Sequence, residues 1–192
     1  MNRAGVGRML VASLHQGISD LIPTRLEFYE NWLNPTGMRD GKIGLAPLAA
    51  VLSFLRQEGA PYTLVTQRAG EYAAQWTYDN LNPIERSLIR ALPVMMRARI
   101  AMRLAKKVVN RSYTGSRGMT KLRRGRGTFT LRSSIFCTVR EPFDWPLCVF
   151  YSAALSHLFA LVGVSGEVRV ETCLGIGDTA CVIGVNVPSD QK

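Results

Sequence analysis

The pattern of apolar positions predicts a mainly helical part over residues 1–114. Leucine, isoleucine, valine and methionine recur there three or four residues apart, which is the spacing of one face of an α-helix. Two prolines interrupt the pattern: Pro23 bends or interrupts the first helix, and Pro93 kinks the longest helix or divides it in two. Helices are expected over Gly5–Asn34, Leu45–Gly59, Ala69–Tyr78 and Asn82–Tyr113, with Tyr62–Thr66 as a short edge strand or an extended link.

The pattern changes after residue 114. Alternating residues over Gly115–Ser133 predict a hairpin or two short strands. Trp145–Gly163 is almost wholly apolar, which predicts a helix buried on all sides. A helix that spans a bilayer is disfavoured, because Ser152, Ser156 and His157 interrupt the run and a hairpin pattern follows it.

A second hairpin is predicted near the end of the chain, with strands over Glu167–Cys173 and Ala180–Val187. Residues 115–192 therefore hold a hairpin, a buried helix and a hairpin that carries cysteines. The chain of 192 residues can bury a core without disulfides, so residues 1–192 are expected to form a single domain. The expected fold class is α+β, with several helices packed on a small antiparallel sheet.

Charge is distributed very unevenly along the chain. The net charge is +10, and the segment from Arg86 to Arg140 contains fifteen lysines and arginines but no acidic residue. Such a segment is typical of a surface that binds an acidic protein, nucleic acid or an anionic membrane, and also of a simple solvated face. Nucleic acid is the less favoured partner, since stacking aromatics and recognised nucleic-acid motifs are missing from the segment.

We expect the basic segment to dock a partner protein. The residues proposed for this surface are Arg97, Arg99, Arg103, Lys106, Lys107, Arg123, Arg124 and Arg126.

Three of the four cysteines lie on the buried helix and the second hairpin. A turn centred on Gly177 would place Cys173 opposite Cys181, and Cys148 would approach from the helix. Glu171 lies two residues before Cys173 and is therefore expected on the same face of its strand. Two or three sulfurs with one carboxylate suit Zn²⁺, although inert buried thiols or a reactive pair remain alternatives.

The sequence favours a binding protein over an enzyme. It contains no phosphate-binding loop, nucleophile elbow or metalloprotease motif, and nothing pairs a nucleophile with a base. The N-terminus lacks the continuous apolar core of a signal peptide, so the protein is expected in the cytoplasm with reduced thiols.

The last fifty residues resemble the 4-vinyl reductase domain family. The similarity lies in the run that begins at Trp145, the glutamate and cysteine at the end of the strand, the turn at Gly177 and Asp178, and the interval from Cys173 to Cys181. This family shares a superfamily with subunits of the TRAPP vesicle-tethering complex and with haem–nitric oxide sensors. The resemblance implies helices on a small antiparallel sheet, a homodimer and an apolar pocket.

Some relatives in this superfamily sense aromatic hydrocarbons in transcription activators and hold a structural zinc with cysteines and a glutamate. The resemblance therefore implies Cys148, Glu171, Cys173 and Cys181 as zinc ligands here. It also implies a small-molecule-binding regulatory module that acts through a partner protein. The alternatives are a TRAPP-like interaction subunit without ligand, or an accessory protein of tetrapyrrole metabolism.

Large apolar side chains on the helices could line a pocket for a small apolar or aromatic ligand, although such residues also form ordinary cores. The candidates are Met95, Met96, Met102, Trp145, Phe150, Tyr151 and Phe159.

Overall fold

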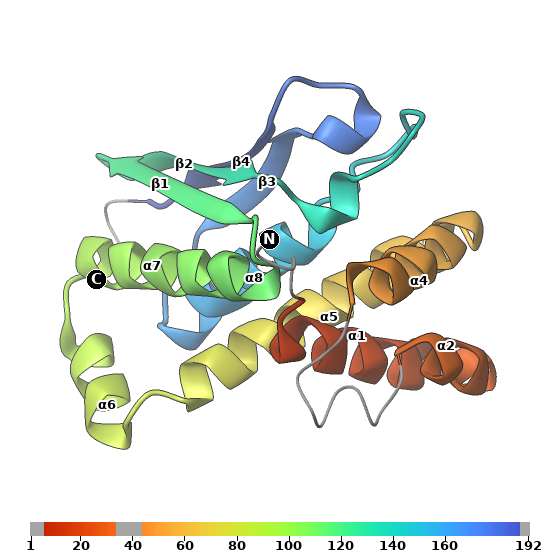
Figure 1. Ribbon diagram of the computed structural model, residues 1–192. Helices are drawn as coiled ribbons and strands as arrows, with labels where there is room; N and C mark the ends of the chain where they lie inside the picture. The colour runs from red at the N-terminus through yellow and green to blue at the C-terminus, as the bar shows by residue number, and fades with distance from the viewer. Residues whose placement is uncertain (1–5, 34–43, 189–192) are drawn as a thin grey trace.

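A computed structural model of the chain describes residues 6–33 and 44–188. These residues form seven α-helices and one antiparallel sheet of four strands, which confirms the predicted α+β class (Figure 1). The helices are α1 (Arg8–Leu21), α2 (Leu26–Leu33), α4 (Leu45–Gln57), α5 (Ala60–Asp79), α6 (Pro83–Ala91), α7 (Val94–Ser112) and α8 (Val149–Leu161). The strands are β1 (Arg117–Arg123), β2 (Arg126–Arg132), β3 (Glu167–Thr172) and β4 (Cys181–Asn186), in the order β1-β2-β4-β3.

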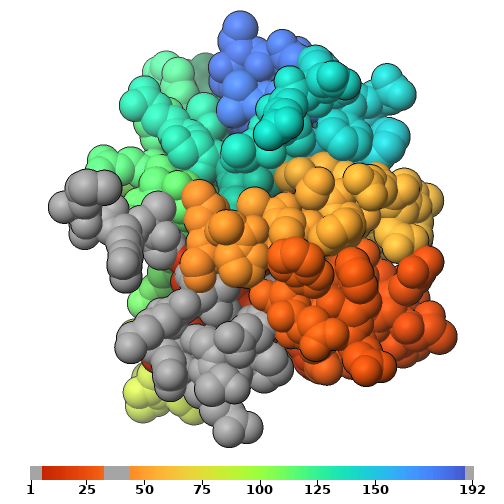
Figure 2. Space-filling model, turned by 45° about the vertical axis from the view of Figure 1, so that its right-hand side comes forward, coloured from red at the N-terminus to blue at the C-terminus, as the bar shows by residue number. Residues whose placement is uncertain are grey.

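Helix α8 lies in the middle of the molecule. It packs against α5 on one side and α7 on another, and it also contacts β3 of the sheet. Helix α1 packs on α5, so the helices form layers beneath the inner face of the sheet (Figure 1). Figure 2 shows α4, in orange, between the red N-terminal helices and the green-to-blue C-terminal part.

The sheet has one buried and one exposed face. Phe129, Leu131 and Ile183 point to the inner face and are fully or almost fully buried. The β1–β2 hairpin turns through Arg124 and Gly125, whose φ angles of 49° and 81° belong to the left-handed region that two-residue hairpin turns require. Helix α7 lies beneath β1, because Gly118 approaches the backbone of Lys106 closely.

Several predicted helix boundaries are confirmed. The first helical segment bends after Leu21, where the short 3₁₀ turn η1 (Pro23–Arg25) separates α1 from α2; its predicted ends, Gly5 and Asn34, lie outside the described residues. Pro93 separates α6 from α7. Asn82 caps α6 in a capping box, in which its side chain accepts from Ile84 N–H while the Glu85 carboxylate accepts from Asn82 N–H.

The prediction of a strand or link over Tyr62–Thr66 is wrong, because this segment belongs to α5. The β-branched residues Thr63, Val65 and Thr66 favour strands locally, but Tyr62, Val65, Thr66 and Ala69 are all buried and share one helical face. Burial of that face outweighs the local preference of the side chains.

Helix α8 begins later than predicted, at Val149 instead of near Trp145. The carbonyl of Leu147 accepts a hydrogen bond from the Tyr62 hydroxyl at 2.8 Å, so it is not used in a helical turn. Residues 138–148 instead cross the molecule without regular structure, and Phe143 N–H donates to Gly175 O at 2.8 Å.

Over the described part of the chain, no helix combines the length and the apolar character that crossing a bilayer requires.

Replacing Gly70 with alanine should destabilise the protein by about 1–3 kcal/mol. A methyl group there would lie 2.2 Å from the carbonyl oxygen of Phe150, so α5 and α8 would have to separate. A glycine-to-alanine change inside a helix ordinarily stabilises the protein by up to about 1 kcal/mol. A loss of stability would therefore indicate the close contact between α5 and α8. Urea unfolding followed by circular dichroism measures it, with Gln67→Ala on the exposed side of α5 as the control. A Gly70→Ala protein of unchanged or higher stability would contradict the close approach of the two helices.

Candidate metal centre

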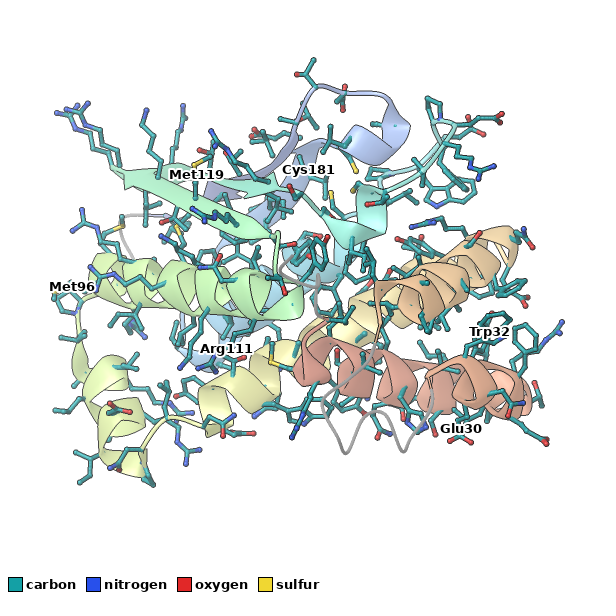
Figure 3. All side chains as sticks on the ribbon, viewed as in Figure 1. Glu30, Trp32, Met96, Arg111, Met119 and Cys181 are labelled. Carbon is teal, nitrogen blue, oxygen red and sulfur yellow. The ribbon has the colours of Figure 1, made fainter. Side chains whose placement is uncertain are left out.

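Four buried cysteine side chains converge at one end of the sheet. Cys137 ends the 3₁₀ turn η2 (Ile135–Cys137), Cys148 precedes α8, Cys173 follows β3, and Cys181 begins β4. Their four Sγ atoms lie within 4.8 Å of one another, and all four thiols are free. Figure 3 shows sulfur atoms gathered beside the labelled Cys181.

The loop between β3 and β4 is shaped to present two of these sulfurs. It contains the 3₁₀ turn η3 (Leu174–Ile176), and Gly177 follows with a φ of 93°, which favours glycine. The Asp178 carboxylate accepts a hydrogen bond from Cys173 N–H at 2.7 Å and so fixes the start of the loop.

Glu171 does not join the sulfurs, because a β-bulge interrupts β3 between Val170 and Thr172. Val170 pairs with Ile183 on the inner face, whereas Thr172 pairs with Val182, whose side chain is on the outer face. The extra residue shifts the alternation by one, so Cys173 turns inward beside Cys181.

Glu171 instead lies on the outer face of the sheet, over Gly184. There it lines an open groove of about 750 Å³ together with Lys121 and Arg169. The prediction that Glu171 and Cys173 share a face is therefore wrong. The fourth member of the group is Cys137, where the sequence predicted the Glu171 carboxylate.

Backbone N–H groups point at two of the sulfurs. Gly175 N–H donates to Cys173 Sγ at 3.4 Å, and Leu174 N–H donates to Cys181 Sγ at 3.3 Å. Such donors stabilise a thiolate more than a thiol. Hydrogen bonds from Cys137, Cys148 and Cys181 also hold the pKa of Cys173 below its ordinary value. The loop therefore favours negative charge on sulfur.

Two of the other three thiols, Cys137 and Cys148, resist losing their protons, whereas hydrogen bonds from those two lower the pKa of Cys181. Hydrogen bonds with Cys137, Cys173 and Cys181, together with burial, raise the pKa of Cys148 far above its ordinary value. Cys173 and Cys181 thus lose their protons more easily than the other two, but several buried thiolates need a cation among them.

The spacing of the sulfurs fits a tetrahedral metal ion. The closest pairs are Cys137 with Cys173 at 3.4 Å and Cys181 with Cys137 at 3.5 Å, whereas a disulfide bond would need about 2.05 Å. A zinc ion with Zn–S bonds of about 2.3 Å would place its sulfurs about 3.8 Å apart, so small shifts suffice. Four sulfur ligands leave no position for water or substrate, which is typical of a structural site.

The proposed pocket residues are distributed between core and surface. Met102, Phe150, Tyr151 and Phe159 are buried, Met95 and Trp145 are half-buried, and Met96 is exposed at the start of α7 (Figure 3). Phe150 and Tyr151 contact Phe136, which the sequence pattern did not single out.

The proposed basic surface is also divided. Arg99, Arg103 and Lys106 are exposed on α7, Lys107 is half-buried there, and Arg123, Arg124 and Arg126 are exposed at the tip of the β1–β2 hairpin. Arg97 has a structural contact, because its guanidinium donates to Val162 O at 3.0 Å and Gly163 O at 2.7 Å at the end of α8.

Cys137 is the functional candidate that sequence reasoning missed. It lies between the predicted elements, in a segment with neither helical nor strand periodicity. The signal that could have found it is the cysteine count, since a tetrahedral zinc site needs four ligands and the chain has four cysteines.

We expect Cys137→Ser to weaken zinc binding about a hundredfold, whereas Glu171→Gln should leave it unchanged. Structural zinc sites contribute about 10–16 kcal/mol, so one of four equal ligands corresponds to about 3 kcal/mol. Metal analysis and the thiolate-to-metal absorption of the cobalt-substituted protein measure both variants. Loss of metal in Glu171→Gln with full binding in Cys137→Ser would restore the carboxylate as the fourth ligand.

No family model and no curated protein matches the sequence. Several solved structures are similar in fold, including the following two. The phenol-responsive sensory domain of the transcription activator PoxR, determined with phenol, superposes with a TM-score of 0.52 at 16% identity, over 77% of this chain and 76% of that domain. An H-NOX protein from S. oneidensis, in the Fe(II)NO ligation state, superposes with a TM-score of 0.58 at 10% identity, over 95% of this chain and 99% of that protein. The chain therefore shares its fold with a phenol-responsive sensory domain and an H-NOX protein.

Proposed function

We propose that the chain is a cytoplasmic sensory module of the 4-vinyl reductase type, which binds a small aromatic molecule among its helices and acts through a partner protein. One observation carries this proposal: two buried hydroxyl groups that complete no hydrogen bond of regular geometry lie beside a cluster of aromatic rings. An apolar environment with a few polar groups is the usual composition of a small-molecule site.

The aromatic cluster consists of Phe136, Phe150 and Tyr151. The rings of Phe136 and Phe150 are stacked with their centroids 4.9 Å apart. The ring of Tyr151 meets both at 90°, with centroid distances of 5.4 Å to Phe136 and 5.1 Å to Phe150. These are the offset and edge-to-face geometries that aromatic rings prefer, so an aromatic ligand could replace or extend the contacts.

The polar groups of this region are the Tyr151 hydroxyl and the Ser134 hydroxyl. Both are buried, and neither completes a hydrogen bond of regular geometry among the described residues, although the Ser116 and Ser134 hydroxyls lie near that of Tyr151. An unsatisfied buried hydroxyl costs about 1–3 kcal/mol. Burial raises the pKa of Tyr151 above its ordinary value, so its hydroxyl keeps the proton and can donate to a ligand oxygen. A hydroxylated aromatic compound would satisfy both the rings and the hydroxyls.

The similar structures agree with an organic ligand. The PoxR domain responds to phenol, and the H-NOX protein holds iron with nitric oxide. In this chain both histidines have contacts outside the aromatic cluster: His15 Nε2 lies 2.7 Å from Glu30, and His157 Nε2 lies 3.1 Å from Gln75. The arrangement therefore favours an aromatic compound over an iron centre.

The metal centre and the aromatic cluster share two segments of the chain. Cys137 directly follows Phe136, and Cys148 precedes Phe150 by two residues. A zinc ion held by the four cysteines would fix both segments and so orient the rings. The centre then has a structural part in ligand binding, without contact between metal and ligand.

Calorimetric titration with phenol and toluene, together with native mass spectrometry of the protein from its source, tests this function. Binding of either compound, or a co-purified aromatic molecule, supports it. A protein that carries no ligand, binds neither compound and co-purifies with one partner at fixed stoichiometry would instead be an interaction subunit.

Tyr151→Phe should lower the affinity for phenol roughly tenfold and leave that for toluene unchanged, because only phenol can use the hydroxyl. The free energy of unfolding should stay the same or rise by about 1 kcal/mol, since the variant removes an unsatisfied buried group. Tyr29→Phe is a matched control, because the Tyr29 hydroxyl is also buried and unpaired but lies outside the cluster. Equal effects of the two variants on phenol binding would place the ligand elsewhere.

A further inference from the structure

We propose that the free edge of β1 binds an extended acidic segment of a partner protein as an additional strand of the sheet. The site lies along the seam between β1 and α7, where the structure combines unused backbone groups, shallow hollows and unpaired cations. This partner would be the one through which the proposed sensory module acts, and its binding can be measured without a small ligand.

Strand β1 is an edge strand whose outward backbone groups can be identified. Gly118 N–H donates to the side chain of Asn110 at 3.1 Å, so it points away from β2. Antiparallel pairing alternates, so Thr120 and Leu122 also direct their backbone groups away from β2. The two-residue turn is consistent with this pattern. Arg123 and Arg126 flank the turn as a hydrogen-bonded pair, so the next outward-facing residue of β1 is Leu122.

These outward groups are available for pairing. In the described part of the chain, the N–H groups of Thr120 and Leu122 have no hydrogen-bond partner outside the sheet. An edge strand with unused donors and acceptors is the usual template for binding an extended peptide.

One hollow lies at this edge, and a second on α7 shares two of its lining residues. The first, of about 190 Å³, is lined by Arg99, Met102, Arg103, Thr120 and Leu122. The second, of about 150 Å³, is lined by Met96 and Ile100 together with the same two arginines. The hollows therefore combine apolar walls with two guanidinium groups, which suits a strand that alternates acidic and apolar side chains.

The cations along the seam are not neutralised by the protein itself. Among the described residues, no ion pair involves Arg99, Arg103, Lys106 or Arg117. They lie within the segment Arg86–Arg140, which contains no acidic residue. An acidic segment would relieve the repulsion among them and gain charge-assisted hydrogen bonds.

The chemistry of the edge favours a peptide over nucleic acid. A free β-strand edge presents carbonyl acceptors as well as N–H donors, and phosphate groups can satisfy only the donors. The residues that line the two hollows include no aromatic side chain on which bases could stack. A peptide backbone matches both kinds of group at the spacing of the strand.

Fluorescence anisotropy with the full chain and a labelled eight-residue peptide of alternating glutamate and valine tests the proposal. Thr120→Pro removes one outward N–H group and leaves the β1–β2 ladder intact, since proline is tolerated on the free side of an edge strand. We expect it to weaken binding roughly tenfold, and Arg103→Glu to do the same. Thr120→Val and Arg90→Glu are the matched controls and should change affinity less than about twofold.

Two further probes separate the alternatives. The same peptide with every backbone amide methylated should not bind, and a single-stranded oligothymidylate should bind less tightly than the acidic peptide. Equal binding of the methylated peptide would overturn strand addition, and tighter binding of the oligonucleotide would assign the surface to nucleic acid. Circular dichroism and metal content show whether Thr120→Pro is folded; if it is not, Arg103→Glu and the methylated peptide decide.

Discussion

Helix α8 carries apolar side chains around most of its circumference, and such a helix is stable only when that surface is covered. Only the face with Ser156 and Ala160 is exposed. Helices α5 and α7 and the sheet supply this cover, and the absence of a side chain at Gly70 lets α5 approach closely. Both ends of α8 are also held by specific contacts. Cys148 brings its N-terminus to the group of sulfurs, and the guanidinium of Arg97 binds carbonyls at its C-terminus. The position of the remaining elements follows from the need to surround this one helix.

The candidate metal centre and the aromatic cluster are two consequences of the same arrangement. The segment between Cys137 and Cys148 has no regular structure, so it needs other contacts to hold it. Its two ends meet at the sulfurs, and its flanks carry Phe136 and Phe150 into the core. A metal ion there would hold this segment in position, as hydrogen bonds of regular secondary structure hold other segments, and it would do so next to the aromatic rings.

Much of the fold could be predicted from the sequence because periodicity reports burial directly. The proline boundaries, the helix start at Asn82 and both hairpins are local signals, and the structure contains all of them. The segment Tyr62–Thr66 could not be assigned in this way, because its β-branched residues favour a strand while its burial follows a helix. The start of α8 depends on the hydrogen bond between Tyr62 and Leu147, two residues far apart in the sequence.

The site was predictable only in part, for a similar reason. The proximity of Cys173 and Cys181 follows from a hairpin with a tight turn, which is a local property. Whether Cys137 joins the group of sulfurs depends on how an irregular segment crosses the molecule, and no periodic pattern in the sequence predicts that path. The placement of Glu171 depends on a one-residue bulge, and the alternation rule cannot reveal an extra residue inside a strand.

The bulge in β3 also makes the two faces of the strand independent of each other. Because alternation changes phase at Glu171, the residues before it can vary in charge on the outer face while the sulfur at Cys173 keeps its orientation. The outer face can thus adapt to solvent or to new partners, and the buried centre is insulated from those substitutions. Deleting that one residue would leave regular alternation with Cys173 still facing inward, so the outer face can lose its carboxylate without a change at the sulfurs.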